Sequence, residues 1–403
     1  MVHVAILGFG TVGGGVAEVL EKNGIHIDEK VHLPIRLKYI LDVRDFPDSP
    51  FADKIIHDFS IIENDPDVGV VVETIGGARV AKEFTERLLK AGKSVVTSNK
   101  ELVATHGYEL LQLAKEHDAS YLFEASVGGG IPIIRPLSQC LAANELTEIC
   151  GILNGTTNYI LTRMIRAGLS FEAALKEAQD NGYAEQDPTA DVEGQDSCRK
   201  ICILSSLAFG RHIYPEQVPA EGITGVTLGD IAYADSCGRK IKLLGRAIRR
   251  DDGKICAYVA PHLVEGREPL ASVEDVFNGI AVKGDAIGDV MFYGRGAGKL
   301  PTASAVVADV MDAAKHMKSH KYLEWGPGGE DLTVSPDTLA SAWYVRAQAG
   351  ADAVRAAFGE VSLLARSGAP AGEVAFLSAS MTRPVLEEKL AGLAPQSVIR
   401  MLD

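Results

Sequence analysis

Val2-His3-Val4-Ala5-Ile6-Leu7-Gly8-Phe9-Gly10-Thr11-Val12-Gly13 is the stretch that decides the fold of this chain. Its first six residues are apolar enough for a buried strand, and the glycine-rich loop after them opens a helical pattern over 11–22. Glycine here permits a tight turn, close approach of the backbone to a pyrophosphate, and close packing of helix on strand, while the helix N-terminus offers free N–H groups to the anion. A purely structural glycine turn is the alternative. The loop predicts a dinucleotide site whose contacts are Gly8, Phe9, Gly10, Thr11, Val12 and Gly13.

The alternation of strand and helix continues through the first third of the chain. Strand-like runs occupy 4–7, 37–41, 68–73, 94–97 and 121–123, and helical patterns occupy 11–22, 80–91 and 102–117. Strands that are nearly continuous in apolar residues are typical of a parallel sheet with helices on both faces. We therefore expect an α/β fold with a Rossmann-type parallel sheet, formed by residues 1–130.

The remainder of the chain has a different order of predicted helices and strands. Helical patterns near 156–167, 171–181 and 192–209 and strands near 146–153, 254–262 and 281–290 predict an α+β catalytic and dimerisation domain over 131–325. A helix over 303–320 is expected to return to the first domain. The Gly- and Pro-rich stretch 325–329 is typical of a linker. Residues 335–403 then follow the β-α-β-β-α-β order of a small ferredoxin-like unit.

Length, charge and cysteine content restrict the class of protein. A chain of 403 residues suggests two or three domains. The net charge of −14 disfavours nucleic acid and anionic membranes as partners. No apolar run reaches the length of about 18 residues that a membrane span needs. The six cysteines show no disulfide spacing, and the N-terminus has no signal-peptide pattern, so we expect a cytoplasmic protein with reduced thiols.

The end of the second strand bears on the choice of cofactor. Asp42 and Arg44 both follow it. An acidic residue there binds a ribose 2′-hydroxyl and favours NAD, whereas an arginine accommodates the 2′-phosphate of NADP. Arg44 is also compatible with a solvated surface charge, so both NAD and NADP remain candidates.

Two lysines are candidate catalytic groups. Lys100 follows a buried-type strand over 94–97, and ligands of open α/β sheets bind beyond the carboxyl ends of strands; a surface lysine before a helix is the alternative. Lys200 lies four residues after Asp196 on an apolar helical pattern, so the two share a face. A surface ion pair is the alternative there. A desolvated pair is costly and usually functional, and burial lowers the pKa of a lysine toward the range that suits proton transfer.

Taken together, the motifs resemble those of the homoserine dehydrogenase family over residues 1 to about 320. The stretches that carry the resemblance are the glycine loop, 97–100, 123–132, 151–160, 182–200, 292–298 and 301–304. Asn154-Gly155-Thr156-Thr157-Asn158 and Gly182-Tyr183-Ala184-Glu185 are the more specific of these motifs; the glycine loop alone is not.

The resemblance implies interconversion of L-homoserine and L-aspartate 4-semialdehyde with NAD or NADP. It implies that Lys200 exchanges the proton of the substrate oxygen, that Lys100 assists near the nicotinamide, and that Glu185 and Asp196 bind substrate. By the same resemblance, further cofactor contacts are Arg44, Ser98, Lys100, Gly182 and Gly296. Glu124, Val127, Gly129 and Ile131 match a sodium-type site built largely of backbone carbonyls, and hard oxygen ligands suit such an ion.

The resemblance also implies a homodimer or homotetramer, and it likens the C-terminal unit to an ACT regulatory domain. The match departs at Gln348-Ala349-Gly350-Ala351-Asp352, where ACT domains usually carry an Asp-x-x-Gly-type ligand loop, so an oligomerisation role stays open. Two other functions are alternatives. A phosphorylating semialdehyde dehydrogenase would need a reactive cysteine beside the nicotinamide, and a nucleotide-sensing protein would need neither lysine.

Overall fold

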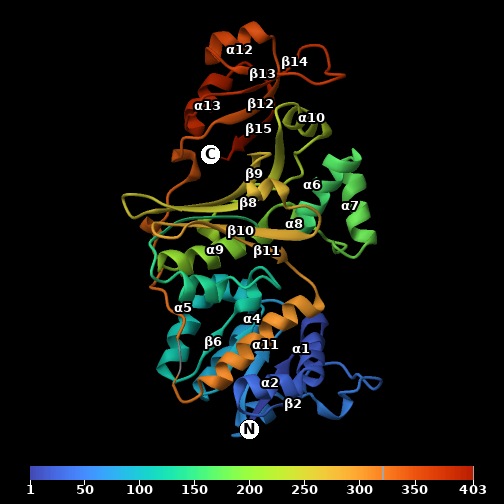
Figure 1. Cartoon of the computed structure of the whole chain (residues 1–403), viewed down its shortest axis with the longest axis vertical. Coiled ribbons are helices and arrows are strands. Elements are labelled where there is room, and N and C mark those ends of the chain that lie inside the picture. Colours follow the sequence, from blue (N-terminus) through green and yellow to red (C-terminus); the bar gives the residue numbers. More distant parts are fainter. Residues whose placement is uncertain (320–321, 403) are drawn as a thin grey trace. The chain divides into compact units, whose positions relative to one another are not determined.

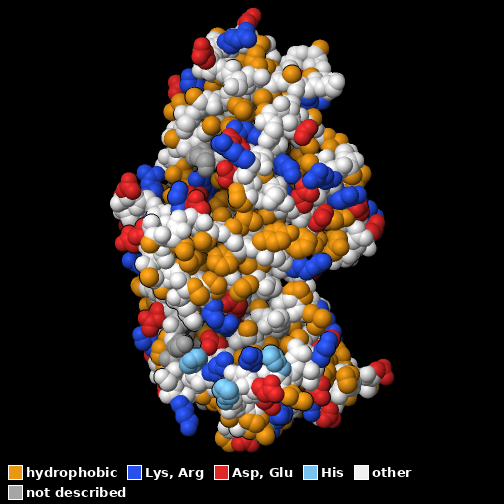
Figure 2. Space-filling model, in the orientation of Figure 1, with side chains coloured by type: hydrophobic (Ala, Val, Ile, Leu, Met, Phe, Trp, Pro, Cys, Tyr) orange, Lys and Arg blue, Asp and Glu red, His pale blue; other side chains and the backbone are white. Residues whose placement is uncertain are grey.

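The computed structural model describes residues 1–319 and 322–402, which form two compact units. The first unit comprises Met1–Asn144, Cys202–Pro215 and Gly294–Gly329, and the second comprises Glu145–Ile201, Glu216–Tyr293 and the chain from Glu330 onward. No helix of the described residues is long and apolar enough to cross a membrane. Basic and acidic side chains are interspersed on the visible face of each unit (Figure 2).

The first unit is built on a six-stranded parallel sheet in the order β3-β2-β1-β4-β5-β6 (Figure 1). Its strands are β1 (Val2–Leu7), β2 (Ile35–Leu41), β3 (Ile55–Ile56), β4 (Val68–Glu73), β5 (Ser94–Thr97) and β6 (Tyr121–Leu122). Its helices include α1 (Thr11–Lys22), α2 (Gly24–Val31), α3 (Phe59–Asn64), α4 (Arg79–Lys90), α5 (Lys100–Glu116) and α11 (Lys299–Lys315). This strand order is that of a dinucleotide-binding Rossmann sheet, which confirms the predicted fold class.

Helix α11 belongs to the core of this sheet although it comes late in the chain. Its residues Ala303, Val306 and Val310 are buried in one cluster with Val4 and Ile6 of β1. A Cβ on Gly15 of α1 would lie 3.0 Å from the Cβ of Ala303, so glycine lets the two helices approach closely. The helix begins and ends earlier than the predicted range 303–320, whose last residue lies outside the described residues.

The second unit contains a nine-stranded sheet in the order β11-β10-β7-β8-β9-β15-β12-β14-β13. The strands that precede the C-terminal part are β7 (Leu146–Ile152), β8 (Arg239–Arg249), β9 (Ile255–Glu265), β10 (Phe277–Gly284) and β11 (Gly288–Arg295). The helices are α6 (Gly155–Ala167), α7 (Phe171–Asp180), α8 (Thr189–Val192), α9 (Gln195–Phe209) and α10 (Leu228–Ser236). The division between the units falls inside α9 and again inside β11.

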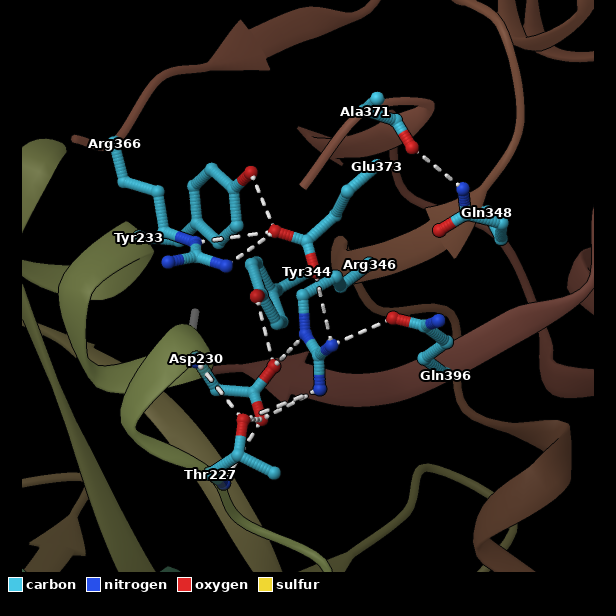
Figure 3. A network of polar contacts seen from close by, with 10 residues as sticks. All are labelled: Thr227, Asp230, Tyr233, Tyr344, Arg346, Gln348, Arg366, Ala371, Glu373 and Gln396. Carbon is cyan, nitrogen blue, oxygen red and sulfur yellow. Dashed lines mark hydrogen bonds and ion pairs between the residues drawn. The ribbon is translucent and has the colours of Figure 1, made fainter. Parts of the chain in front are cut away.

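The C-terminal part has the predicted β-α-β-β-α-β order but does not stand alone. Its elements are β12 (Trp343–Gln348), α12 (Ala351–Phe358), β13 (Ser362–Leu364), β14 (Glu373–Leu377), α13 (Arg383–Leu390) and β15 (Pro395–Met401). Strand β15 pairs in parallel with β9, where Arg400 lies opposite His262. A network of buried charged side chains, drawn in Figure 3, also links this part to α10.

One sequence prediction about these regions was wrong, and the predicted linker, which ends at the division between the units, is in part packed into the first unit. The range 281–290, predicted as one strand, spans the turn between β10 and β11. The stretch 325–329, predicted as a linker, begins with the buried residue Trp325, whose indole N–H donates to His212 Nδ1 at 3.0 Å. The glycines and the proline allow the backbone conformation of this segment, but the buried tryptophan fixes the segment to the first unit.

Candidate active site

The glycine loop has the geometry that a bound pyrophosphate requires. Gly8 has a φ of +90°, which favours glycine, and a Cβ on Gly13 would lie 2.0 Å from the carbonyl oxygen of Gly8. A Cβ on Gly10 would meet no atom within 4 Å, so this position faces open space. The loop borders a cavity of about 570 Å³ whose wall includes Gly8, Gly10, Asp42, Arg44 and Thr74. The cavity and the closely packed glycines fit a dinucleotide.

Asp42 and Arg44 are joined rather than independent. Arg44 donates from Nε to Asp42 Oδ1 at 3.0 Å and from Nη2 to Oδ2 at 3.2 Å, and the backbone N–H of Phe9 donates to Oδ2 at 2.7 Å. The hydrogen bond from Arg44 lowers the pKa of Asp42 to about 2, against the effect of burial. The acidic residue is thus held by the glycine loop, while the arginine side chain is 61% exposed.

Lys100 is presented by the end of β5. Asn99 is the N-cap of α5, since its Oδ1 accepts from the backbone N–H of Leu102 at 3.1 Å, and Lys100 is therefore the first residue of that helix. Ser98 and Lys100 are both half-buried. Strand β5 lies beside β4, which pairs with β1, so all three strands end at the same edge of the sheet as the glycine loop.

The predicted cation loop lies against the loop that carries Gly296. Gly128 and Gly129 have φ values of +74° and +54°, and a Cβ on Gly129 would lie 2.5 Å from the carbonyl oxygen of Gly296. The structure therefore brings these two predicted regions together within the first unit. The carboxylate of Glu124 accepts from the backbone N–H groups of Ile133, Ile134 and Arg135 at 2.6, 2.8 and 2.9 Å. Its side-chain oxygens therefore already bind groups of the protein itself.

Lys200 and Asp196 form a buried pair on α9 in the second unit. Lys200 Nζ donates to Asp196 Oδ2 and to the carbonyl oxygen of Leu153, both at 2.7 Å. Lys200 is 8% exposed and Asp196 4%. The predicted shared helical face is confirmed, and the pair is not the exposed surface pair that was the alternative.

Two further residues belong to this cluster. Asn154 Nδ2 donates to Asp196 Oδ2 at 2.8 Å and to Asp191 Oδ1 at 2.7 Å. Burial and the neighbouring charge of Asp196 raise the pKa of Asp191. Asp191 precedes Asp196 by five residues on the separate helix α8, and the turn at Gly194, with a φ of +80°, brings them together. Neither Asn154 nor Asp191 was predicted as a site residue, although Asn154 begins one of the motifs named above and closely follows the end of β7.

Gly182 and Glu185 lie in the loop between α7 and α8. Gly182 has a φ of +72°, and the carbonyl oxygen of Glu185 accepts from Gln179 Nε2 at 3.1 Å. Both residues are exposed, whereas Asp196 and Lys200 are buried, and the contact described for Glu185 is the one from Gln179. The structure thus unites Asp196 with Lys200 but does not add Glu185 to them.

No group of three or more His, Cys, Asp or Glu side chains within the described chain could hold a metal ion. Cys150, Cys198, Cys202 and Cys256 are buried, and no cysteine of the described residues lines the cofactor cavity. The arrangement required by a thioester-forming dehydrogenase is therefore not found there.

The Rossmann sheet and its glycine loop define a dinucleotide-binding protein of the kind found in nicotinamide-dependent oxidoreductases. Comparison with known proteins specifies the family. The model described as homoserine dehydrogenase, NAD binding domain, matches residues 8–124, and the model described as homoserine dehydrogenase matches residues 132–311. The chain belongs to the homoserine dehydrogenase family.

Individual relatives agree with this assignment. Homoserine dehydrogenase of Bacillus subtilis (strain 168) is 43% identical over 354 residues, which cover 86% of this chain and 81% of the relative. The crystal structure of a homoserine dehydrogenase from Thiobacillus denitrificans is 34% identical, covers 100% of this chain and 98% of that one, and has a TM-score of 0.91. A hyperthermophilic archaeal homoserine dehydrogenase in complex with NADPH is 28% identical, covers 80% and 99%, and has a TM-score of 0.67.

Proposed function

We propose that this chain interconverts L-homoserine and L-aspartate 4-semialdehyde with a nicotinamide dinucleotide. The observation that carries the proposal is the cluster of Asp191, Asp196 and Lys200, in which one ammonium group lies among two carboxylates joined through Asn154. The excess carboxylate is a natural partner for the ammonium group of an amino-acid substrate, and the lysine is a proton donor for its oxygen.

Lys200 is the proposed acid and base. When the aldehyde is reduced, an alkoxide develops on its oxygen, and a cationic lysine both stabilises that charge and donates the proton. In the oxidising direction the same group accepts the proton of the hydroxyl group. Asp196 holds the Lys200 ammonium in place at 2.7 Å and, with Glu185, is the proposed substrate ligand.

Lys100 is the proposed second lysine of the reaction. It begins α5 at the same sheet edge as the glycine loop, and we assign it contacts with the nicotinamide and with the reacting oxygen. The bound cofactor supplies or accepts the hydride; the protein positions the reactants and provides charge. Ser98, Gly182 and Gly296 are proposed as further cofactor contacts.

The test is the activity of Lys200→Ala, followed by nicotinamide absorbance with L-homoserine. We expect kcat to fall at least about 100-fold with little change in cofactor affinity, because one acid-base group contributes about 10²–10⁴ in rate. Lys176→Ala is the matched control, since Lys176 also pairs with an aspartate four residues away, but on the exposed face of α7. Near-normal turnover of Lys200→Ala would refute the role, and a lack of turnover in the unaltered protein would favour a nucleotide-sensing function.

Arg44 is proposed to bind the 2′-phosphate of NADP. Its guanidinium group lies on the wall of the cavity, and the carboxylate of Asp42, which would bind a 2′-hydroxyl, is already held by Arg44 and by the N–H of Phe9. The archaeal relative named above was solved with NADPH. Arg44→Ala should therefore weaken NADPH binding more than NADH binding; equal losses would contradict this preference.

A sodium ion is proposed at the loop that contains Val127, Gly129 and Ile131. These residues are buried, and their carbonyl oxygens accept no hydrogen bond from the described residues, whereas the carbonyl oxygen of Gly128 accepts from the N–H of Ile131. Buried carbonyl groups normally have partners, and a hard monovalent cation would be one, together with the carbonyl oxygen of Glu124. Activity that does not change between sodium and tetramethylammonium buffers would contradict this site.

The assembly is proposed to be a homodimer or homotetramer through the second sheet. Strand β11 is an edge of that sheet, its Tyr293 is 57% exposed, and hydrophobic side chains gather over β10 and β11 in Figure 2. Sedimentation of a monomer at micromolar concentration would contradict it. A cytoplasmic location and an ACT-like regulatory or oligomerisation role of the C-terminal part are retained as proposals.

A further inference from the structure

Glu73, the last residue of β4, is a carboxylate that none of the proposed catalytic steps uses. It is fully buried, and it lies opposite Thr97 of β5 in the parallel register and next to Leu7 of β1 on the other side. Removing a carboxylate from water is costly unless several donors compensate it. Its position at the strand ends that carry the cofactor loop and Lys100 suggests a role in joining them.

The two oxygens of Glu73 bind two different segments. Oε1 accepts from the backbone N–H of Ile75 at 2.6 Å, and Oε2 accepts from the hydroxyl group of Thr97 at 2.6 Å. Ile75 belongs to the loop after β4, which forms part of the wall of the cofactor cavity. Thr97 ends the strand that leads to Lys100. One carboxylate therefore connects the cavity wall with the base of the lysine segment.

Both connections continue outward to the proposed cofactor and catalytic groups. On one side, the hydroxyl group of Thr74 donates to the carbonyl oxygens of Leu7 and Gly8, both at 2.9 Å, which fixes the glycine loop. On the other side, Thr97 Oγ1 accepts from the backbone N–H of Asn99 at 2.9 Å, and Asn99 caps the helix that Lys100 begins. Asn99 Nδ2 also donates to the carbonyl oxygen of Gly77 at 2.8 Å.

We propose that Glu73 is a positioning residue whose ionised carboxylate holds the 74–77 loop and the segment that presents Lys100 in one fixed arrangement. The part that concerns Lys100 rests on the function proposed above. Protonation of Oε1 opposes the bond from the N–H of Ile75, and after protonation of Oε2 the bond to Thr97 persists only if that hydroxyl group turns to accept it. The cofactor cavity is therefore best formed when Glu73 is charged.

Because of the surroundings of Glu73, we expect its protonation to occur near neutral pH. Burial raises its pKa to about 7, while hydrogen bonds from Thr97, Ile75 and Asn99 act in the opposite direction. From β6, the buried Tyr121 is the titratable group that feels the charge of Glu73, and burial together with that charge raises the pKa of its hydroxyl group. His57 lies on the wall of the same cavity and also has a raised pKa, because of its contact with the carbonyl oxygen of Asp42.

The experiment measures the dissociation constant of NADPH between pH 6 and 8.5 by its fluorescence, for the full-length protein and three variants. For the unaltered protein we expect tighter binding as the pH rises through about 7. Glu73→Gln should bind NADPH at least fivefold more weakly at pH 8 and should lack this part of the pH dependence. Thr97→Val should move the midpoint to higher pH, because it removes a hydrogen bond that lowers the pKa of Glu73. His57 is present in every variant, so its contribution to the pH dependence of NADPH binding is the same in all of them. The difference between a variant and the unaltered protein therefore reports on Glu73.

Thr85→Val is the matched control. Thr85 is a fully buried threonine of α4 in the same unit, and its hydroxyl group has no partner among the described residues. We expect it to leave the profile unchanged. If Glu73→Gln keeps the profile of the unaltered protein, or if Thr97→Val behaves like Thr85→Val, the proposal is overturned. If Glu73→Gln does not fold, the shift in Thr97→Val decides. Normal turnover of Lys100→Ala would refute the role of that lysine, while NADPH binding would still test Glu73.

Discussion

The second unit contains two buried clusters of charged residues that differ in how completely they neutralise themselves. In the C-terminal network, Arg346 pairs with Asp230 and Glu373, and Arg366 pairs with Glu373 (Figure 3). Two guanidinium groups thus meet two carboxylates. In the cluster on α8 and α9, the ammonium group of Lys200 pairs with Asp196, and Asn154 joins Asp196 to Asp191. Among the contacts of the described residues named above, the second cluster has one more carboxylate than it has cationic groups.

The hydrogen bonds of the two clusters show the same difference. Tyr344 and Tyr233 donate to Asp230 and Glu373 at 2.9 and 3.1 Å. Burial acts to raise the pKa of both carboxyl groups, but bonds from the arginines and hydroxyl groups outweigh it and the pKa of each is lowered. For Asp191, burial and the charge of Asp196 raise the pKa. A buried ion pair alone therefore does not indicate catalysis, and we propose that the additional carboxylate is what distinguishes the cluster of Lys200.

The largest effect should come from breaking the balanced network. Arg346→Met leaves the buried carboxylate of Asp230 without its cationic partner and removes one of the two guanidinium groups from Glu373. We expect the free energy of unfolding to fall by about 3–5 kcal/mol. The turnover of the folded protein should stay close to normal. Urea unfolding measures the first quantity and nicotinamide absorbance the second.

Arg355→Met is the control for this prediction. Arg355 is 60% exposed and pairs with an exposed aspartate three residues away on α12, so its removal should change stability by less than about 1 kcal/mol. A large loss of turnover in Arg346→Met at unchanged stability would mean that the balanced network also serves catalysis, and the comparison would fail.

Sequence patterns predicted the regions where the signal is local. The ranges of α1, β4 and β5 agree with the predictions residue for residue, because each has its own periodicity and its own end signals. Strand β8 was not predicted. Its Lys242 and Arg246 are buried: Lys242 donates to the carbonyl oxygen of Val273, and Arg246 pairs with Glu148. The charged residues that alternate along this strand therefore do not form an exposed face of the sheet.

The sites divide in the same way. The glycine loop and the spacing of Asp196 and Lys200 were visible in the sequence. Asp191 was not selected, because its place beside Asp196 depends on the turn at Gly194. The C-terminal network could not be predicted at all, since Arg346 reaches Asp230 across 116 positions and Glu373 across 27. Such contacts depend on the sheet order.

A moderate effect is expected from removing the excess charge. Asp191→Asn keeps an oxygen that can accept from Asn154 but leaves the cluster neutral. We expect the KM for L-homoserine to rise about tenfold, equivalent to about 1.4 kcal/mol, with a smaller change in kcat. Asp187→Asn is the control, since Asp187 is exposed and, among the described residues, its carboxylate accepts from the nearby Thr189. An unchanged KM would show that the excess carboxylate does not bind the substrate ammonium.

The smallest effect is the pH dependence of stability in the same variant, and it has opposite signs in the two clusters. The raised pKa of Asp191 means that its ionisation costs the folded state, a cost absent below the ordinary pKa of 3.8 and complete above the folded value. Asp191→Asn should therefore unfold like the unaltered protein at pH 3.5 and be more stable at pH 8, by about 0.5 kcal/mol.

Asp230 has a lowered pKa and stabilises the fold above pH 3.8, so Asp230→Asn should lose stability at pH 8 and lose less of it as the pH falls. If both variants lose stability at pH 8, Asp191 is held as firmly as Asp230, and charge imbalance does not separate a catalytic cluster from a structural one.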